Sequence, residues 1–410
     1  MPTAIVFEPS SQPATAPSPT AEPGAAVAPS PDAAFEPGPK TRPASAARPA
    51  SAAAGTGLVS PGDAAAGAEP DSPPRPSPAV RRAIYRDMVL TRAFDQAATA
   101  LQRQGELALW APSLGQEAAQ VGSAHALSER DWVFPSYREH GVLQSRGVDL
   151  KQLLPLFRGA DNGGWDTESH RVHLYTLVVG AQALPAVGYA MGMALDGAAE
   201  ITVLYLGDGA TSQGEASEAL VWAASCQAPI LFFIQNNGWA ISTPTRTQSR
   251  VALARRGEGF GIPSERVDGN DADACWAATA AALARIRAGQ GPQLIEALTY
   301  RAGPHTTSDD PSRYRTAAEE AGWAQRDPIA RLRAALQADG QADADFFADA
   351  DAAGAALAAE ARRGCLAIEP PRLDDCFDSV YASEHGLVAQ EKAAALADGV
   401  PEAGVRENAR

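Results

Sequence analysis

The sequence has little cysteine and no paired cysteine motif. Its 410 residues include four cysteines, and none of them belongs to a C-x-x-C pair. Their spacing does not fit a zinc site, and so few scattered thiols predict a reduced, cytoplasmic protein. The first ten residues lack a basic region followed by an apolar one, so no secretory signal is expected. The cysteines are Cys226, Cys275, Cys365 and Cys376.

Positive charge is also scarce. Lys and Arg number 34 against 49 Asp and Glu, which gives a net charge of −15. An acidic chain of this kind is not expected to bind nucleic acid, which needs a basic face. It also lacks the polybasic segment that anionic lipid attracts.

One apolar stretch, residues 175–195, is long enough to span a bilayer, with Gln182 its only strongly polar residue. It contains three glycines and Pro185, and no cluster of Lys or Arg flanks it. We therefore expect no membrane span. The pattern instead predicts a buried strand edge that runs into a packed Gly/Ala-rich helix.

Aromatic residues are almost missing from residues 1–78, which contain Phe7 and Phe35 but no Trp or Tyr. The same stretch holds 18 of the 32 prolines. A segment of this composition cannot bury enough apolar surface to offset its ordering entropy, so we predict a disordered tail. We expect an α/β domain with N-terminal helices over 79–340 and a helical extension over 341–410.

Short apolar runs alternate with helical patterns in the centre of the chain. Alternation of strands and helices is typical of a parallel sheet that helices cover on both sides, and strands buried on both faces are apolar throughout. The sequence therefore predicts an α/β fold with helices on both faces of a parallel sheet. The expected strands are 201–206, 229–234 and 293–299, and the expected helices are 79–104, 116–127, 149–158, 215–226 and 271–288.

Polar loops follow two of these strands. Gly207-Asp208-Gly209 ends the first, and Asn236-Asn237 ends the second, 28 and 29 residues after the aspartate. Ligands bind at the carboxyl ends of parallel strands, and Asp and Asn oxygens suit magnesium with phosphate. No Walker motif is present, and Ser212 breaks the dinucleotide fingerprint. A lone Gly-Asp-Gly is more often an ordinary turn. The combination of Gly-Asp-Gly after one strand with Asn-Asn after the next is the more specific indication of a site.

This combination resembles the thiamine-diphosphate motif. Residues 206–214, 235–244, 267–271 and 303–310 together resemble the α subunit of the decarboxylating component of 2-oxo acid dehydrogenase complexes. The resemblance covers roughly residues 80–340. It implies an enzyme that uses thiamine diphosphate and magnesium to decarboxylate a 2-oxo acid oxidatively and to transfer the acyl group to a lipoyl arm.

The resemblance also implies a set of ligands. Magnesium would be held by Asp208, Asn237 and the backbone carbonyl of Trp239. The turn formed by Gly207, Gly209 and Ala210 and the pair Tyr137-Arg138 would bind the diphosphate, and Val179 would pack on the aminopyrimidine. Gln235 stands where some relatives carry an arginine, which weakens any role for it as a phosphate ligand.

Among the histidines, His305 is the candidate catalytic residue. In the family this histidine faces the thiazolium and serves acyl transfer to lipoyl groups, and imidazole suits proton transfer near neutral pH. His173 also matches a family histidine near the cofactor, although a structural hydrogen bond explains it equally well. Thr306 occupies a position that mitochondrial relatives phosphorylate, and structural packing of the loop is the simpler interpretation. The other histidines, His125, His140, His170 and His385, have no comparable support.

The motifs cover only the diphosphate half of such a site. The resemblance therefore implies a β subunit in an assembly of two α and two β chains, and a lipoyl-bearing acyltransferase. Residues 306–310 favour 2-oxoisovalerate, a branched-chain 2-oxo acid, as substrate; pyruvate is the alternative and acetoin a third. Two other classes stay open: a non-catalytic α-like scaffold and a magnesium-dependent phosphate-binding regulator.

Overall fold

The computed structural model describes residues 74–161, 164–378 and 380–398. The chain divides into two units, Met1–Gly67 and Ala68–Arg410, and all described residues belong to the second. The predicted disordered tail lies outside the described residues, except for its last five positions. Helix α1, Pro78–Arg103, begins at the end of those five, with the Ser77 side chain accepting a hydrogen bond from the Val80 N–H.

A five-stranded parallel sheet forms the centre of the fold, in the order β1-β2-β3-β7-β6. The predicted strands are confirmed as β2, β3 and β7. The sequence missed the two edge strands, because β1 has only three residues and β6 alternates polar side chains. The strands are β1 Trp132–Phe134, β2 Thr202–Gly207, β3 Ile230–Asn236, β6 Ser264–Asp268 and β7 Gln293–Leu298.

Alternate residues of the central strands enter two separate cores, as the two-residue period of a strand requires. Tyr205 and Phe233 point into the core of one face, whereas Leu204 and Phe232 point into the core of the other. Both sets are buried. The continuous apolar runs in the sequence therefore reflect a sheet that is covered on both sides, and the predicted fold class is confirmed.

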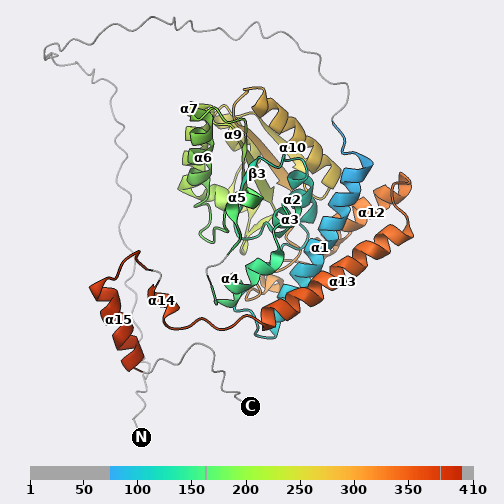
Figure 1. The fold of residues 1–410 in the computed structure, drawn as a ribbon. Helices are drawn as coiled ribbons and strands as arrows, with labels where there is room; N and C mark the ends of the chain where they lie inside the picture. Colours follow the sequence, from blue (N-terminus) through green and yellow to red (C-terminus); the bar gives the residue numbers. More distant parts are fainter. Residues whose placement is uncertain (1–73, 162–163, 379, 399–410) are drawn as a thin grey trace, which may run out of the picture. The chain divides into compact units, whose positions relative to one another are not determined.

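Helices cover both faces (Figure 1). On one side lie α6 (Ala183–Leu195), α7 (Gly214–Cys226) and α9 (Ala254–Gly259). On the other lie α2 (Glu117–Ala124) and α10 (Ala272–Arg287), with α1 packed outside them. The predicted helices in these regions are confirmed to within a few residues.

The C-terminal helix α13, Ala344–Leu366, packs along α1. Phe347 is fully buried there, with its ring edge-on to Tyr85 at 5.0 Å. Farther on, Lys392 of α15 (Gly386–Ala397) forms ion pairs with Asp374 and with Asp378 of α14 (Asp375–Asp378). These three helices lie within the predicted helical extension 341–410, and the boundary of that extension stays a prediction.

The remaining elements are short or peripheral. The helices are α3 His140–Ser145, α4 Leu154–Arg158, α5 Thr167–His170, α8 Thr245–Gln248, α11 Ala317–Ala324, α12 Pro328–Ala338, α14 Asp375–Asp378 and α15 Gly386–Ala397. Single 3₁₀ turns cover Leu150–Leu153, Gly209–Ser212 and Pro311–Arg313. A two-stranded ribbon joins β4 Trp239–Ala240 and β5 Thr243–Pro244.

The apolar stretch 175–195 does not contain the strand that we expected. Only Val172 bridges to Val133 of β1, and the following residues form an exposed loop in which Val178 is 71% accessible. The loop ends at Gly180, whose φ of +84° turns the chain into α6. The prediction of a strand was wrong because this apolar run is partly surface rather than core.

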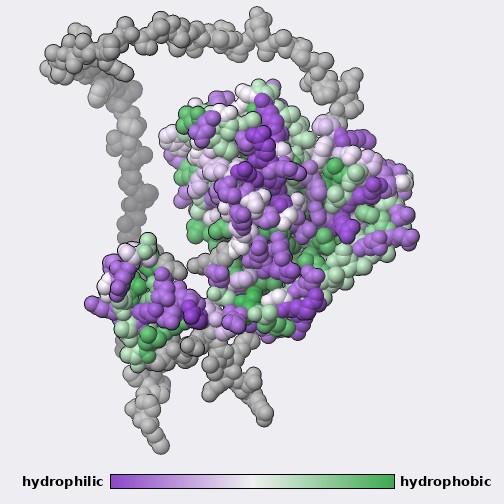
Figure 2. All heavy atoms as spheres, viewed as in Figure 1, coloured by the Kyte–Doolittle hydropathy of each residue, from purple (hydrophilic) through white to green (hydrophobic). Residues whose placement is uncertain are grey.

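The helical half of that stretch is confirmed as α6, whose 13 residues are too few to cross a bilayer. Among the described residues, no helix has the length and apolarity that a membrane span requires. On the face shown in Figure 2, hydrophilic residues interrupt the hydrophobic ones throughout.

Candidate functional site

The two sequence motifs meet at the carboxyl edge of the sheet. Gly207 of β2 pairs in register with Gln235 of β3, so the residues that follow them leave the sheet side by side. A cavity of about 250 Å³ opens there. All of the residues predicted to bind the cofactor or metal line it: Tyr137, Arg138, Val179, Gly207, Asp208, Gly209, Ala210, Asn237, Trp239 and His305.

The glycines of the first turn leave room for a ligand. A Cβ atom built on Gly207 would meet nothing within 4 Å, so a side chain there would project into open space beside the cavity. At Gly209 a Cβ would lie 2.8 Å from the Cβ of Ala240, which permits no side chain without a shift. Backbone N–H groups in such a turn approach phosphate oxygens closely.

Asp208 is a buried carboxylate at the head of this turn. Its Oδ2 accepts hydrogen bonds of 2.9 Å from Thr245 Oγ1 and Gln248 Nε2, both on α8. Burial raises the pKa of Asp208, because desolvation penalises the charged form. A bound cation would reverse this penalty and keep the carboxylate ionised.

The other two predicted metal ligands lie on the loop after β3. Asn237 donates through Nδ2 to Gln116 Oε1 at 3.1 Å, and its Oδ1 accepts from the Trp239 N–H at 3.3 Å. The Trp239 carbonyl accepts from Arg301 Nη1 at 3.0 Å. A carbonyl oxygen has two lone pairs, so this bond leaves it one for a cation. One carboxylate, one amide oxygen and one carbonyl form a donor set that suits magnesium.

Two arginines surround His305. Arg138 Nη2 donates to the His305 carbonyl at 2.7 Å, and Arg301 Nη1 lies 3.2 Å from His305 Nδ1. Burial, and then the two guanidinium groups, lower the pKa of His305 to about 4. The imidazole is therefore neutral at physiological pH and can accept a proton.

Positive charge is in excess at this end of the cavity. Arg138 and Arg301 are both buried. The nearby carboxylate of Asp309 partly offsets their charge, and its Oδ2 accepts from the His305 N–H at 2.8 Å. Burial, and then Arg138, lower the pKa of Arg301 to about 10. An anion bound between the two guanidinium groups would relieve this repulsion, so the side chains present fit a diphosphate.

Sequence reasoning missed several residues of the site. Glu139 is buried beside Arg138, and its Oε1 accepts from Gln235 Nε2 at 2.7 Å. Gln235 Oε1 in turn accepts from Gln120 Nε2 at 3.0 Å. Gln235 therefore belongs to a buried hydrogen-bond network at the wall of the cavity. The position of Glu139 next to the Tyr-Arg pair was the signal that could have revealed it, whereas Arg301 carried no local signal.

His173 does not line the cavity. Its ring stacks on Phe134 at 3.8 Å and contacts Trp132 and Tyr189, and burial lowers its pKa. Its Nε2 is buried without a hydrogen-bond partner among the described residues. Thr306 also lies outside the cavity lining; its carbonyl accepts from the Asp309 N–H at 2.9 Å.

The histidines without sequence support have structural partners. His140 Nε2 donates to the Ala111 carbonyl at 2.9 Å, and burial lowers the pKa of His140 to about 3. His125 pairs with Asp87 at 2.7 Å. All four cysteines are free, and the described part of the chain contains no group of three or more His, Cys, Asp or Glu placed to hold a metal.

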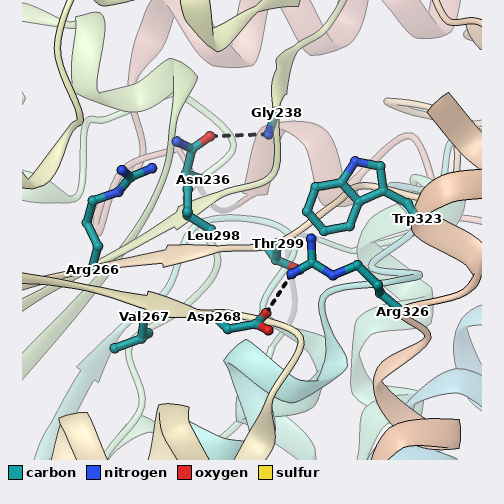
Figure 3. Close-up of a pocket in the computed structure, with 9 residues that line it drawn as sticks. All are labelled: Asn236, Gly238, Arg266, Val267, Asp268, Leu298, Thr299, Trp323 and Arg326. Atoms are coloured by element: carbon teal, nitrogen blue, oxygen red, sulfur yellow. Dashed lines mark hydrogen bonds and ion pairs between the residues drawn. The ribbon is translucent and has the colours of Figure 1, made fainter.

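A second cavity, of about 450 Å³, is lined by Asn236 and Gly238, the two neighbours of Asn237 (Figure 3). Its two arginines are already paired. Arg266 contacts Glu296 at 3.1 Å, and Arg326 contacts Asp268 at 3.2 Å and lies over the ring of Trp323. None of the predicted site residues lines this cavity.

Comparison with known proteins gives a consistent result. The model of the family "Dehydrogenase E1 component" matches residues 85–361. The α subunit of 3-methyl-2-oxobutanoate dehydrogenase from Mycobacterium tuberculosis is 44% identical over 313 residues, which is 76% of this chain and 85% of that protein.

Two similar proteins are α subunits of the pyruvate dehydrogenase E1 component. The one from Acholeplasma laidlawii is 46% identical over 255 residues, 62% of this chain and 74% of that protein. The one from Staphylococcus epidermidis is 41% identical over 259 residues, 63% of this chain and 70% of that protein. The family match and the length of these alignments agree with the motifs at the cavity. The chain therefore belongs to the dehydrogenase E1 component family, as the α subunit of a thiamine-diphosphate-dependent 2-oxo acid dehydrogenase.

Proposed function

We propose that this chain is the α subunit of a dehydrogenase for 3-methyl-2-oxobutanoate, the branched-chain 2-oxo acid also called 2-oxoisovalerate. The observation that carries the proposal is the 44% identity to the mycobacterial α subunit named for that substrate, over 85% of its length. Pyruvate is the second candidate, because two relatives named for it are 46% and 41% identical over shorter alignments.

The cavity would hold thiamine diphosphate and magnesium. Asp208, Asn237 and the Trp239 carbonyl supply oxygen ligands for the metal, and Arg138 and the glycine turn face the position of the diphosphate. Val179, which also lines the cavity, would offer an apolar surface to the aminopyrimidine. When bound, the cofactor supplies the carbanion-stabilising centre on which a 2-oxo acid loses carbon dioxide.

His305 would move the proton that acyl transfer to a lipoyl sulfur requires. Its neutral imidazole can accept a proton, and the two neighbouring guanidinium groups disfavour its protonation while no anion is bound. A bound diphosphate would neutralise that positive charge and raise the pKa of His305 toward the neutral range, where a residue can both accept and donate.

A β subunit would complete the site. The two carboxylates that line the cavity, Asp208 and Glu139, are already engaged by neighbouring side chains. Among the described lining residues none is left to activate the cofactor's pyrimidine. Exposed apolar side chains lie beside the cavity: Ile241 lines it, and Leu177 and Val178 precede its lining residue Val179. Exposed apolar side chains are expected of a surface that a partner covers. A lipoyl-bearing acyltransferase would then receive the acyl group.

The test is turnover by the complex of this chain with its β subunit. We expect it to oxidise 3-methyl-2-oxobutanoate with a higher kcat/KM than pyruvate when a lipoyl domain is the acceptor. A preference for pyruvate would contradict the proposed substrate but keep the enzyme class. The isolated α chain is the control, and full activity of that chain alone would contradict the need for a β subunit.

A further inference from the structure

The loop of residues 104–116, between α1 and α2, supports several parts of the cavity. We call it the α1–α2 loop. Pro112 accepts from Arg138 Nη1 through its carbonyl, and Gln116 Oε1 accepts from Asn237 Nδ2 at 3.1 Å. The Trp110 carbonyl accepts from the Thr307 N–H at 2.9 Å. This segment therefore contacts Arg138 on the diphosphate side, Asn237 on the metal side and the loop of residues 299–310, which carries His305 and which we call the His305 loop.

The contact with the His305 loop is close at several points. The Leu114 carbonyl accepts from the Ala302 N–H at 2.9 Å, and the Gly115 carbonyl accepts from Thr299 Oγ1 at 2.9 Å. A Cβ on Gly303 would lie 3.2 Å from the Cβ of Pro112. A shift of the α1–α2 loop would therefore shift the segment that carries His305.

Asp95 anchors this loop to the middle of α1. The side chain is buried, with 2% of the residue accessible. Its Oδ1 accepts from Trp110 Nε1 at 2.7 Å, and its Oδ2 accepts from the Ser113 N–H at 3.1 Å. Both oxygens of one carboxylate are used, so an amide in the same place would lose one of the two bonds.

We propose that Asp95 is a positioning residue for the reaction: its carboxylate holds Trp110 and Ser113, and through them the α1–α2 loop keeps Arg138 and the His305 loop in place. Asp95 touches no substrate or cofactor position in the cavity. The inference rests on the proposed function and adds to it a residue on a different element, outside the sequence motifs.

Burial of the Asp95 carboxylate makes this anchor sensitive to pH. Burial, opposed by the hydrogen bond from Trp110 and reinforced by Glu117 of α2, raises the pKa of Asp95 to about 7. Arg138 acts in the opposite direction, and the Tyr175 hydroxyl is also coupled to Asp95. A cavity of about 440 Å³, lined by Asp95 and Arg103, lies next to the carboxylate.

A protonated Asp95 has one good acceptor for two donors. The charged form is present above the pKa and is lost as the pH falls through about 7. Protonation therefore leaves either Trp110 Nε1–H or the Ser113 N–H without its acceptor, so the rate of the assembled enzyme should fall on the acidic side. The raised pKa also means that the folded chain binds this proton more tightly than the unfolded chain, so the fall in rate comes from altered positions within the folded chain and not from unfolding.

The experiment compares three variants in the complex with the β subunit. Asp95→Asn removes one of the two bonds, and Trp110→Phe removes the ring donor but keeps most of the packing. Asp87→Asn is the matched control, because Asp87 also lies on α1 but pairs with His125 and Gln144, away from the cavity. We measure kcat, KM and the unfolding midpoint from about pH 6 to pH 9.

We expect Asp95→Asn to lower kcat by roughly 10- to 100-fold, because small misplacements of catalytic groups have effects of this size. In this variant the fall in kcat on the acidic side of neutral pH, which we call the acid limb, should disappear. Trp110→Phe should move the acid limb to higher pH, because the charged carboxylate loses a donor. Asp87→Asn should change the unfolding midpoint without moving the limb.

A second readout does not depend on turnover. Diethyl pyrocarbonate should modify His305 faster in Asp95→Asn than in wild type or Asp87→Asn, as followed by mass spectrometry of the full chain. Equal modification rates in folded Asp95→Asn and wild type would overturn the proposal. If Asp95→Asn does not fold, an acid-side fall in rate that does not move in Trp110→Phe would overturn it. A wild-type complex that turns over no 2-oxo acid would instead contradict the proposed function, and the modification rates would still decide the role of Asp95.

Discussion

The two ends of the cavity are built in different ways. At one end, which we call the strand end, Asp208 and Asn237 follow β2 and β3 directly, so the register of the sheet places them. At the other, the loop end, His305 lies on a segment without regular structure and is held by Asp309 and Arg138. Local sequence thus determines the strand end, and tertiary contacts determine the loop end.

The electrostatic difference follows the same division. Burial raises the pKa of Asp208 at the strand end, where, among the described residues, the carboxylate accepts hydrogen bonds from the neutral side chains of Thr245 and Gln248. Burial and two arginines lower the pKa of His305 at the loop end. The strand end therefore offers oxygen ligands that suit a cation, and the loop end offers guanidinium groups that suit an anion, which supports the proposed site for a metal-bound diphosphate.

The largest effect should come from His305→Asn. Loss of a general acid–base group costs roughly 10²- to 10⁴-fold, so transfer to a lipoyl domain should fall by about that factor. Decarboxylation measured with an artificial electron acceptor should fall less, because the strand end is unchanged. His385→Asn, at an exposed position before α15, is the control. Equal losses in both assays would contradict the proton-transfer role and remove the distinction between the two ends.

A smaller effect should come from Arg301→Gln. Removal of one of the two cations that face His305 should raise the pKa of its imidazole by roughly one unit, which is a tenfold change in protonation. Histidine chemical shifts in an NMR pH titration measure this pKa. Arg326→Gln, whose guanidinium pairs with Asp268 in the neighbouring cavity, serves as the control. A pKa of His305 that does not move would contradict the electrostatic account of the loop end.

The residues of the strand end could be assigned to one cavity from the sequence because their signals are local, and their roles toward cofactor and metal stay predictions. A glycine turn after one buried strand and an Asn pair after the next are brought together by parallel pairing alone, which needs no knowledge of side-chain packing. The same reasoning gave the central strands and the long helices. It failed for residues 175–182, where the apolar run forms a loop whose residues 177–179 are exposed beside the cavity.

The loop end could be predicted only in part. His305 was found through its motif, but Arg301, Glu139 and Asp95 act from separate elements through buried polar contacts. Such contacts depend on the packed tertiary structure, and no spacing in the sequence encodes them. The same holds for Gln235, whose role in the network with Glu139 and Gln120 appears only when three elements are assembled.

The most direct test of the account is calorimetric titration of thiamine diphosphate into the assembled α/β complex, with and without magnesium. We predict magnesium-dependent binding to wild type and to Asp196→Asn, an exposed control at the end of α6. Asp208→Asn should bind roughly 100-fold more weakly, because a charged ligand contributes up to about 3 kcal/mol. Unchanged affinity in Asp208→Asn would contradict the claim that the tips of β2 and β3 hold the metal and, through it, the cofactor.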